Sequence, residues 1–420
     1  MRRKAIEAGY ASPRWSQEIT DCSMPMTLDT YSSCSYRCLY CFSFFQKSIG
    51  LSRDDYIKSK TRCVNVEKVK ATILGTVKVK AFQQFVPFTK QRLAIQWGGL
   101  ADQFDENERQ YGISLKLLRF FREIKYPVSM STKATWWTED ERYVELFRKA
   151  KHFNLKISII TLDEEKARRV EVLCPTPMER LRAIEKAAKW GIGGVTLRLR
   201  PLIIGISTPS YLELIKRARD MGAEAVSTEF LCVEQRAKMA KPRWEVIGRH
   251  AGYDLMKLYR KNSPGQTGYL RLVREVKRPF MEKMKELCDK IGMRFYVSDA
   301  HFKELCHNGS CCGLRPKWNY SRAHFTEALL IAKKKGEVRW SDIEKGLDFC
   351  DGFLFRQAEG FNTNSAEVRS QFYTSSLKDW IHYQWNNVNG GKGPYKYFGG
   401  VLVPKGKDEN GDVIYEYKER

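Results

Sequence analysis

The chain has 420 residues, of which 43% are hydrophobic and 12% aromatic, and its formal net charge is +24. This hydrophobic content excludes a wholly disordered protein, because a chain of this composition can bury a substantial core. A positive charge of this size favours a polyanionic partner, above all DNA or RNA. A solvated basic surface that only maintains solubility has the same composition.

The sequence contains no signal for a membrane or for secretion. No stretch approaches the roughly 20 apolar residues of a membrane span. The basic start, Met1 to Lys4, leads into Ala-Ile-Glu-Ala-Gly-Tyr rather than an apolar run. We therefore expect a cytoplasmic protein without a membrane partner, in which cysteines serve as metal ligands or buried side chains rather than as disulfides.

Short apolar runs alternate with longer amphipathic stretches from Met26 to about Thr228, which is the pattern of βα units around a parallel sheet. These units predict an α/β fold, namely a partial (β/α)6 barrel of the TIM type. The expected strands are Met26 to Tyr31, Leu93 to Trp97, Val128 to Ser131, Lys156 to Thr161, Val195 to Leu199 and Ala225 to Thr228. The expected helices are Leu115 to Lys125, Glu139 to Lys151 and Pro177 to Trp190.

Three regions are expected along the chain: a lead-in over 1–24, the barrel over 25–298, and a mixed C-terminal extension over 299–420. Phe295 to Val297 is compatible with one more strand, and the glycines between Gly390 and Arg420 indicate a hairpin or tail. Active sites of parallel α/β folds collect at the carboxyl ends of the strands, so we expect function in the loops that follow them.

The first of these loops reads Cys34-Ser-Tyr-Arg-Cys38-Leu-Tyr-Cys41. Three thiolates this close together can bind three irons of a cubane 4Fe–4S cluster, because soft sulfur ligands favour such centres. The fourth iron would then lack a protein ligand. Two alternatives stay open, a zinc ion with a distant fourth ligand and three cysteines without metal.

The CxxxCxxC spacing matches, residue for residue, that of the radical S-adenosylmethionine (SAM) superfamily, which this loop therefore resembles. The resemblance implies a radical SAM barrel whose cluster binds SAM through its open iron. One electron then cleaves SAM reductively, and the 5′-deoxyadenosyl radical abstracts a substrate hydrogen. An electron donor such as flavodoxin or ferredoxin is implied as well. Tyr40 would lie near the SAM adenine, the alternative being a side chain packed under the loop.

Further matches over roughly residues 25 to 230 resemble the DNA-photolyase-like branch of radical SAM proteins related to spore photoproduct lyase. They are Gly-Leu-Ala-Asp102 with Glu108, Pro127-Val-Ser-Met-Ser131-Thr-Lys133, Ser158-Ile-Ile-Thr161-Leu-Asp163, Val170-Glu171, Pro175-Thr-Pro177 with Arg180, and Arg198-Leu-Arg-Pro201. This branch implies repair or modification of a nucleic-acid base, although thymine photoproduct repair itself is not implied. The alternative is a radical SAM enzyme that modifies a peptide or a small metabolite.

The same resemblance implies a set of residues that contact SAM. Gly98 and Gly99 would receive the methionine amino group, and Asp102 would orient the cofactor or only cap a turn. The residues expected at the SAM carboxylate or ribose, or in the same cavity, are Ser131, Lys133, Ser158 and Arg198. A solvated Lys133 and a satisfied strand hydroxyl at Ser158 are the alternatives.

Relatives of this branch tend to have a Glu-Pro pair where this chain reads Glu171-Val-Leu-Cys174. A thiol that faces the barrel can return a hydrogen atom to a product radical. We therefore hypothesise that Cys174 is this catalytic donor, against the alternative of an inert cysteine.

A second group of cysteines, Cys306, Cys311 and Cys312, is flanked by His301 and His307. Soft ligands at this density predict a possible second metal centre, an iron–sulfur cluster or a zinc ion. The alternative is a set of reduced cysteines that line the barrel base or the substrate pocket.

Between Arg236 and Arg278, twelve Lys or Arg stand against three Asp or Glu, interleaved with Trp244, Tyr253, Tyr259 and Tyr269. Basic residues can neutralise phosphates while exposed aromatic rings stack on unpaired bases. We expect this segment to contact nucleic acid, the alternative being basic helices whose aromatic side chains are part of the core.

Overall fold

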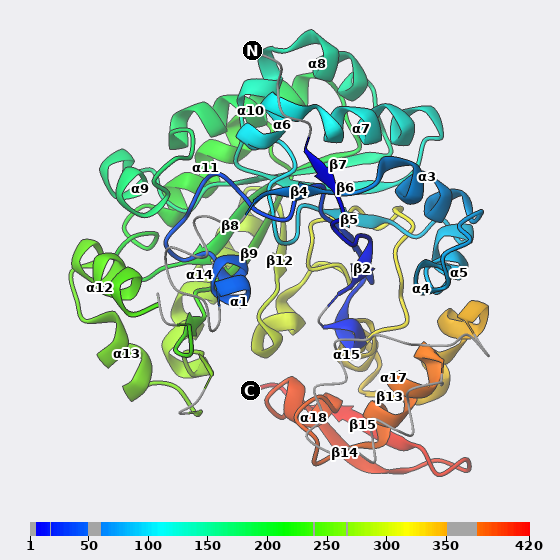
Figure 1. Ribbon diagram of the computed structural model, residues 1–420. Helices are drawn as coiled ribbons and strands as arrows, with labels where there is room; N and C mark the ends of the chain where they lie inside the picture. The colour runs from blue at the N-terminus through cyan, green and yellow to red at the C-terminus, as the bar shows by residue number, and fades with distance from the viewer. Residues whose placement is uncertain (1–5, 17, 49–59, 238–239, 266–267, 351–375) are drawn as a thin grey trace.

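The computed structural model describes residues 6–16, 18–48, 60–237, 240–265, 268–350 and 376–420 (Figure 1). Its centre is an eight-stranded sheet in the order β12-β9-β8-β7-β6-β5-β3-β2, parallel except for β2 against β3. Consecutive parallel neighbours joined by helices confirm the predicted α/β partial barrel. The strands are β2 (Arg14–Trp15), β3 (Met26–Leu28), β5 (Ile95–Trp97), β6 (Val128–Thr132), β7 (Phe153–Ser158), β8 (Gly194–Leu202), β9 (Ala225–Phe230) and β12 (Arg294–Val297).

All six predicted strands exist, and β12 adds the further strand expected near Phe295, although several boundaries differ. β3 ends at Leu28 rather than Tyr31, because the next backbone groups leave the sheet and Thr30 accepts a hydrogen bond from the N–H of Val64. β7 spans Phe153–Ser158, so it begins three residues before the predicted Lys156. Boundaries of this kind depend on hydrogen-bond partners that lie far away in the sequence.

Helices cover the outer face of the sheet, and three of them match predictions. α10 begins with a capping box between Thr176 and Glu179 and is followed by Gly191 at φ +67°. α8 ends at Phe147 rather than Lys151, because Lys149 has a positive φ and its N–H pairs with the carbonyl of Trp190.

The helices around the barrel are α1 (Phe42–Ser48), α3 (Val66–Leu74), α4 (Lys80–Gln83), α5 (Val86–Lys90), α6 (Glu106–Tyr111), α7 (Ile113–Glu123), α8 (Glu141–Phe147), α9 (Glu164–Val170), α10 (Pro177–Lys189), α11 (Tyr211–Asp220), α12 (Ala240–Ala251), α13 (Leu255–Lys261) and α14 (Arg274–Lys290). Two short pairings flank them, β1 (Glu7–Ala8) with β4 (Arg62–Cys63) and β10 (Val233–Glu234) with β11 (Tyr269–Leu270). None of the helices in the described part of the chain combines the length and the apolar character that a membrane crossing requires.

The inner face of the sheet is polar. Apolar residues of the strands, such as Leu155 and Ile157, belong to the main core, and the residues that alternate with them are hydrophilic. The side chains of Asn154 and Ser129 hydrogen-bond at 2.9 Å across β7 and β6, and Arg198 on β8 reaches Ser131 on β6. A polar interior is suited to hold a polar ligand rather than to pack as a core.

A loop of the C-terminal extension closes the barrel at the end opposite the cysteine loop. The carbonyl of Cys311 accepts from Ser227 at 2.8 Å, and the carbonyl of Cys312 accepts from Asn154 near the start of β7. Gly313 packs against Thr196 so closely that an added Cβ would lie 2.4 Å from its Oγ1. The extension therefore contributes to the floor of the barrel interior.

The rest of the extension forms a layer at one end of the molecule (Figure 1). Its described elements are α15 (Phe325–Lys335), β13 (Glu337–Val338), α17 (Leu377–Asn386), α18 (Pro394–Tyr397), β14 (Leu402–Lys407) and β15 (Val413–Tyr417). The strands form an antiparallel sheet in the order β13-β15-β14, and β14 with β15 is the hairpin expected near the C-terminus.

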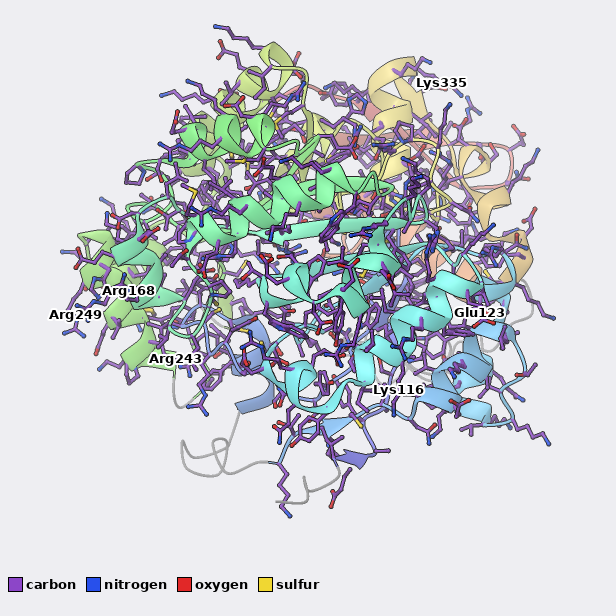
Figure 2. The ribbon with its side chains drawn as sticks, turned by 90° about the horizontal axis from the view of Figure 1, so that it is seen from above. Lys116, Glu123, Arg168, Arg243, Arg249 and Lys335 are labelled. Atoms are coloured by element: carbon purple, nitrogen blue, oxygen red, sulfur yellow. The ribbon has the colours of Figure 1, made fainter. Side chains whose placement is uncertain are left out.

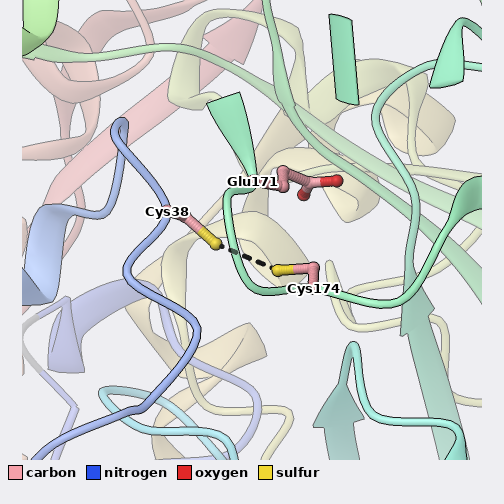
Figure 3. Close-up of side chains that lie close together, drawn as sticks. All are labelled: Cys38, Glu171 and Cys174. Atoms are coloured by element: carbon pink, nitrogen blue, oxygen red, sulfur yellow. Dashed lines mark hydrogen bonds between the residues drawn. The ribbon is translucent and has the colours of Figure 1, made fainter. Parts of the chain in front are cut away.

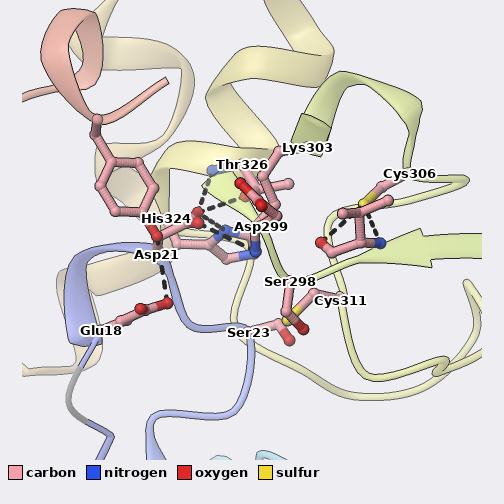
Figure 4. Close-up of polar contacts among 12 residues, drawn as sticks. Glu18, Asp21, Ser23, Ser298, Asp299, Lys303, Cys306, Cys311, His324 and Thr326 are labelled. Carbon is pink, nitrogen blue, oxygen red and sulfur yellow. Dashed lines mark hydrogen bonds and ion pairs between the residues drawn. The ribbon is translucent and has the colours of Figure 1, made fainter. Parts of the chain in front are cut away.

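A buried polar cluster ties the N-terminal lead-in to this extension (Figure 4). The carboxylate of Asp21 lies 3.2 Å from Lys303 Nζ and 3.5 Å from Nδ1 of His324. It also accepts from the backbone N–H of Thr326 at 2.6 Å and from its hydroxyl at 2.5 Å. A buried carboxylate with several donors and a cation is well compensated, so this cluster fixes the two ends of the chain to one another.

Candidate functional site

The cysteine loop lies between β3 and α1, at the carboxyl end of the parallel sheet. Cys38 is buried, whereas Cys34 and Cys41 are half-buried. The three cysteines of the motif thus lie where an α/β barrel normally builds its active site. Burial raises the pKa of the Cys34 and Cys41 thiols above the ordinary value.

The loop is held from the side by buried carboxylates. Asp105 accepts from the backbone N–H of Ser35 at 2.6 Å, and the hydroxyl of Ser35 accepts from the N–H of Glu106 at 3.2 Å. Just before the loop, Tyr31 donates to Glu108 at 2.5 Å. Glu108 also accepts from Tyr143 and from the backbone N–H groups of Ser114 and Leu115, so its burial is compensated.

The glycine loop, which contains Gly98 and Gly99, follows β5. Contacts with neighbouring strands and loops determine its backbone conformation. Gly98 has φ +84°, and a Cβ there would lie 2.7 Å from the carbonyl oxygen of Ser131. A Cβ on Gly99 would lie 2.7 Å from Cγ2 of Thr27. Asp29, directly after β3, accepts from the N–H of Leu100 at 2.7 Å, which fixes the course of this loop.

Asp102 joins the glycine loop to the end of β6. It accepts from the hydroxyl of Thr132 at 2.8 Å and from the backbone N–H of Lys133 at 2.6 Å. Burial raises its pKa, while these hydrogen bonds oppose the shift. In this structure the carboxylate of Asp102 therefore positions Lys133.

Glu171 and Arg180 lie under the cysteine loop and organise the residues around it. Arg180 donates to Glu171 at 2.5 Å and to the carbonyl of Ser158 at 2.7 Å, and both side chains of the pair are 1% exposed. Glu171 also accepts from the hydroxyl of Tyr40 and lies 3.9 Å from Lys133 Nζ. Tyr40, Lys133 and Ser158, predicted separately from the sequence, are thus brought to one place.

Lys133 is not a solvated surface lysine. Its Nζ lies 5.7 Å from the centre of the Tyr40 ring, and its side chain is 16% exposed. Burial works against its charge, but Cys38 and Glu171 outweigh burial and raise the pKa of Lys133. A charged ammonium therefore lies beside the thiol of Cys38.

Ser131 and Arg198 meet on the inner face of the sheet. Arg198 donates to the hydroxyl of Ser131 at 3.2 Å across β7, and Ser158 is the register partner of Arg198. Burial lowers the pKa of the half-buried Arg198 to about 10, and the neighbouring Arg200 acts in the same direction. These residues form a cationic, hydroxyl-lined wall below the Lys133 site.

Cys174 lies in the connection from α9 to α10 and faces the cysteine loop, with its Sγ 3.5 Å from that of Cys38 (Figure 3). Possible ligand atoms of Cys38, Glu171 and Cys174 all lie within 4.8 Å of one another. Among the residues that the structure describes, no other trio of Cys, His, Asp or Glu comes this close. The hydrogen bond from Cys174 lowers the pKa of Cys38, and burial raises the pKa of Cys174.

The chemistry of these donors fits a cubane iron–sulfur cluster held by Cys34, Cys38 and Cys41. One loop supplies three soft sulfur ligands, which is the donor type that such centres require. Lys133 and Arg180 place positive charge near Cys38, which favours its thiolate form.

Comparison with known proteins adds to this geometry. No family model matches the chain, and no curated protein matches it. A cysteine-to-alanine mutant of spore photoproduct lyase superposes with a TM-score of 0.50, covering 70% of this chain and 80% of that chain at 15% identity. The chain has the fold of spore photoproduct lyase. This agrees at the level of fold with the resemblance expected from the sequence.

Two further solved structures superpose on this chain with lower TM-scores. A tyrosine-to-phenylalanine mutant of spore photoproduct lyase gives a TM-score of 0.49 at 16% identity, covering 70% of this chain and 80% of that chain. Streptococcus suis SuiB bound to S-adenosylmethionine gives 0.42 at 14% identity, covering 67% of this chain and 52% of that chain.

The second group of cysteines is spread along the loop that runs from the end of β12 to the floor of the barrel. Cys306 contacts the backbone N–H and carbonyl of Val297, and the thiol of Cys312 lies 3.4 Å from Oε1 of Gln96. Cys311 faces Ser298 and Ser23 at the edge of the Asp21 cluster (Figure 4). Cys311 and Cys312 thus lie at the barrel floor and Cys306 at the end of β12, and a second metal centre at these cysteines stays a prediction.

The basic segment differs from its sequence interpretation in one respect. Trp244 is 1% exposed and donates to the carbonyl of Glu234, and Tyr259 is 2% exposed and donates to the carbonyl of Leu231. The expectation that these two rings stack on bases is therefore wrong, because both are core side chains. Helical spacing of aromatic residues is the same for a core face and for a binding face.

The cations of this segment do reach the cysteine loop. Arg243 on α12 donates to the carbonyl of Cys38 at 3.4 Å, and its guanidinium lies 3.3 Å from the centre of the Phe44 ring. Exposed Arg249 on α12 and exposed Arg168 on the neighbouring α9 lie on the same side of the molecule as Arg243 (Figure 2). Arg243 thus contacts the loop itself, and two further exposed arginines lie on its side of the molecule.

Sequence reasoning did not single out Asp29, Asp105, Glu108, Glu171 or Arg180 as site residues. Each is charged and buried or nearly so, and each touches the cysteine loop, the glycine loop or their supports. Asp29 and Asp105 could have been found from their positions in the sequence. An acidic residue directly after a buried strand or before a helix commonly accepts hydrogen bonds from backbone N–H groups.

Proposed function

We propose that this chain is a radical SAM enzyme. The observation that carries the proposal is the cysteine loop at the carboxyl end of the parallel barrel, with a half-buried ammonium, a buried carboxylate and a buried guanidinium gathered beneath it. Cys34, Cys38 and Cys41 would hold a 4Fe–4S cluster, whose electron cleaves SAM reductively and so starts hydrogen abstraction from a substrate.

The neighbouring residues have roles that follow from their chemistry. Lys133 is placed to neutralise the methionine carboxylate of SAM, and the hydroxyls of Ser131 and Ser158 can bond its ribose. Tyr40 supplies an aromatic face for the adenine. Glu171 fixes Tyr40 and Lys133 together, so its role is to position the two groups rather than to react.

We infer that the substrate is a base in DNA or RNA. The net charge of +24 supports this, as do Arg243, which contacts the cysteine loop, and Arg168 and Arg249 on the same side of the molecule. A base within a duplex would have to be flipped out, at a cost of a few kcal/mol, to reach the barrel interior. Cys174 would then return a hydrogen atom to the product radical.

A peptide or small-metabolite substrate is the second candidate, and one observation favours it. The burial of Trp244 and Tyr259 leaves two of the expected stacking rings unavailable to unpaired bases. Under this alternative the basic surface contributes to solubility or to docking of an acidic electron donor such as flavodoxin or ferredoxin.

The radical SAM assignment is tested by anaerobic reconstitution with iron and sulfide. The loaded chain should show broad absorbance near 400 nm and should release 5′-deoxyadenosine when SAM and a reductant are added. Cys38→Ala should lose both signals, whereas Cys232→Ala, which removes a thiol elsewhere, should keep them. If Cys38→Ala keeps both the absorbance and the release of 5′-deoxyadenosine, the assignment is overturned.

The nucleic-acid substrate is tested separately. Binding to random single-stranded DNA and RNA should be strong at low salt. The logarithm of the binding constant should then fall linearly with the logarithm of the salt concentration. Mass spectrometry of nucleic acid from cells with and without the gene should then reveal a changed base. Negligible binding at low salt would favour the peptide or metabolite alternative.

A further inference from the structure

Cys174 is close enough to a proposed cluster ligand to act on it directly. Its Sγ lies 3.5 Å from Sγ of Cys38, within hydrogen-bond distance for two sulfur atoms. Cys174 comes from the connection between α9 and α10, 136 positions further along the chain. The contact is therefore a product of tertiary structure and not of the CxxxCxxC motif.

The surroundings hold the two thiols in this arrangement. On one side, the backbone N–H of Leu39 donates to the carbonyl of Val170, and that of Leu173 donates to Tyr36, so the cysteine loop and the Cys174 turn are joined by main-chain bonds. On the other, the N–H of Cys174 donates to the carbonyl of Glu171 at 2.9 Å. Main-chain hydrogen bonds therefore hold the backbone on both sides of the sulfur–sulfur contact.

Iron ligation determines which sulfur of the pair donates. A cysteine bound to iron is a thiolate and can only accept, so the hydrogen must come from Cys174. The geometry therefore supports an S–H···S bond from Cys174 to Cys38.

We propose that Cys174 donates a hydrogen bond to the Cys38 ligand of the cluster and thereby makes the cluster easier to reduce. This inference rests on the proposed function, because it needs a cluster at Cys34, Cys38 and Cys41. Hydrogen bonds to ligand sulfurs are among the factors that set the potential of an iron–sulfur centre, since they stabilise the more negative, reduced state. Cys174 is in this role a positioning residue and not a catalytic one.

The test is a potentiometric titration of the reconstituted full chain, followed by electron paramagnetic resonance of the reduced cluster. The Cys174→Ala variant is compared at the midpoint potential of the unmodified chain. At that potential its ratio of reduced to oxidised cluster should be roughly fivefold lower, which is the effect of losing one weak hydrogen bond. Cys174→Ser keeps an O–H donor and should retain most of the unmodified value. Cys232→Ala removes a thiol that contacts Arg271 instead of the cysteine loop, and it should change nothing.

The outcomes separate this inference from the proposed function. A cluster that forms in Cys174→Ala with an unchanged midpoint overturns the inference and leaves the proposed function intact. Failure of the unmodified chain to bind any cluster overturns the proposed function itself. The serine variant also separates this role from hydrogen-atom donation, because a serine hydroxyl can donate a hydrogen bond but holds its hydrogen atom too strongly to give it to a carbon radical.

Discussion

Arg180 and Glu171 form a buried ion pair, with a guanidinium nitrogen 2.5 Å from the carboxylate and 1% of either side chain exposed. Glu171 connects this pair to Tyr40 and Lys133, and Arg180 connects it to the end of β7 through the carbonyl of Ser158. The pair is therefore the structural link between the cysteine loop and the barrel wall. Removal of Arg180 takes from the buried carboxylate of Glu171 its closest cation.

Arg180→Ala should lower the free energy of unfolding by about 3–5 kcal/mol, the usual cost of breaking a buried pair by removing one partner. Arg182→Ala, an exposed arginine on the same helix, is the matched control and should change stability by less than about 0.5 kcal/mol. Urea denaturation of the metal-free chain measures both. Equal effects of the two substitutions would contradict the importance of the Glu171–Arg180 pair.

Asp105 should make stability depend on pH. Burial raises its pKa to about 7, whereas an unfolded aspartate titrates near 3.9. Between about pH 4 and pH 7 the folded chain holds a proton that the unfolded chain has released, so this group's contribution falls as pH rises. In Asp105→Asn, which still accepts from Ser35, unfolding free energy should fall less steeply over this range. Parallel curves for the two proteins would refute this assignment.

The iron content of cysteine variants distinguishes the two groups of thiols. Cys34→Ala, Cys38→Ala and Cys41→Ala should each reduce iron from about four per chain to nearly none. A second centre at Cys306, Cys311 and Cys312 predicts iron above this level, or bound zinc, that is lost in Cys311→Ala. About four irons and no zinc in the unmodified chain would oppose the second centre and favour thiols that only line the barrel base.

Cys174 as hydrogen-atom donor makes a prediction about isotopes. In deuterated water the exchangeable S–H becomes S–D, so the product should gain deuterium from Cys174 and lose this label in both Cys174→Ala and Cys174→Ser. Mass spectrometry of the product measures the incorporation. Unchanged product yield and label in Cys174→Ala would remove Cys174 as the donor.

The arginines near the cysteine loop should carry part of any nucleic-acid affinity. Replacing Arg168 and Arg249 together by alanine should reduce the slope of log affinity against log salt by about two, one for each lost phosphate contact. Lys116 and Lys335, exposed on other faces of the molecule, form the control pair and should leave the slope unchanged (Figure 2). A slope that responds equally to both pairs would mean that binding is spread over the whole surface.

The sequence was a good guide to the order of the elements and a poor guide to what surrounds the cysteines. Periodicity found the strands and helices of the barrel, because burial on one face repeats locally. Composition misjudged Trp244 and Tyr259, because basic helices with core aromatic rings and a nucleic-acid-binding face have the same residue content. Glu171 and Arg180 were visible only as parts of a family resemblance, since nothing local marks a charged residue that will be buried.

From the residues alone it follows that three cysteines share one loop after a strand, and that this strand begins a series of βα units. Both facts are local, because they depend on spacing along a few residues. The position of Lys133, Glu171 and Cys174 around Cys38 depends on the folded barrel, since residues from separate loops meet when the strands adopt their order and the sheet curves. The electrostatic surroundings of the cysteines are therefore a property of the closed barrel and not of the motif.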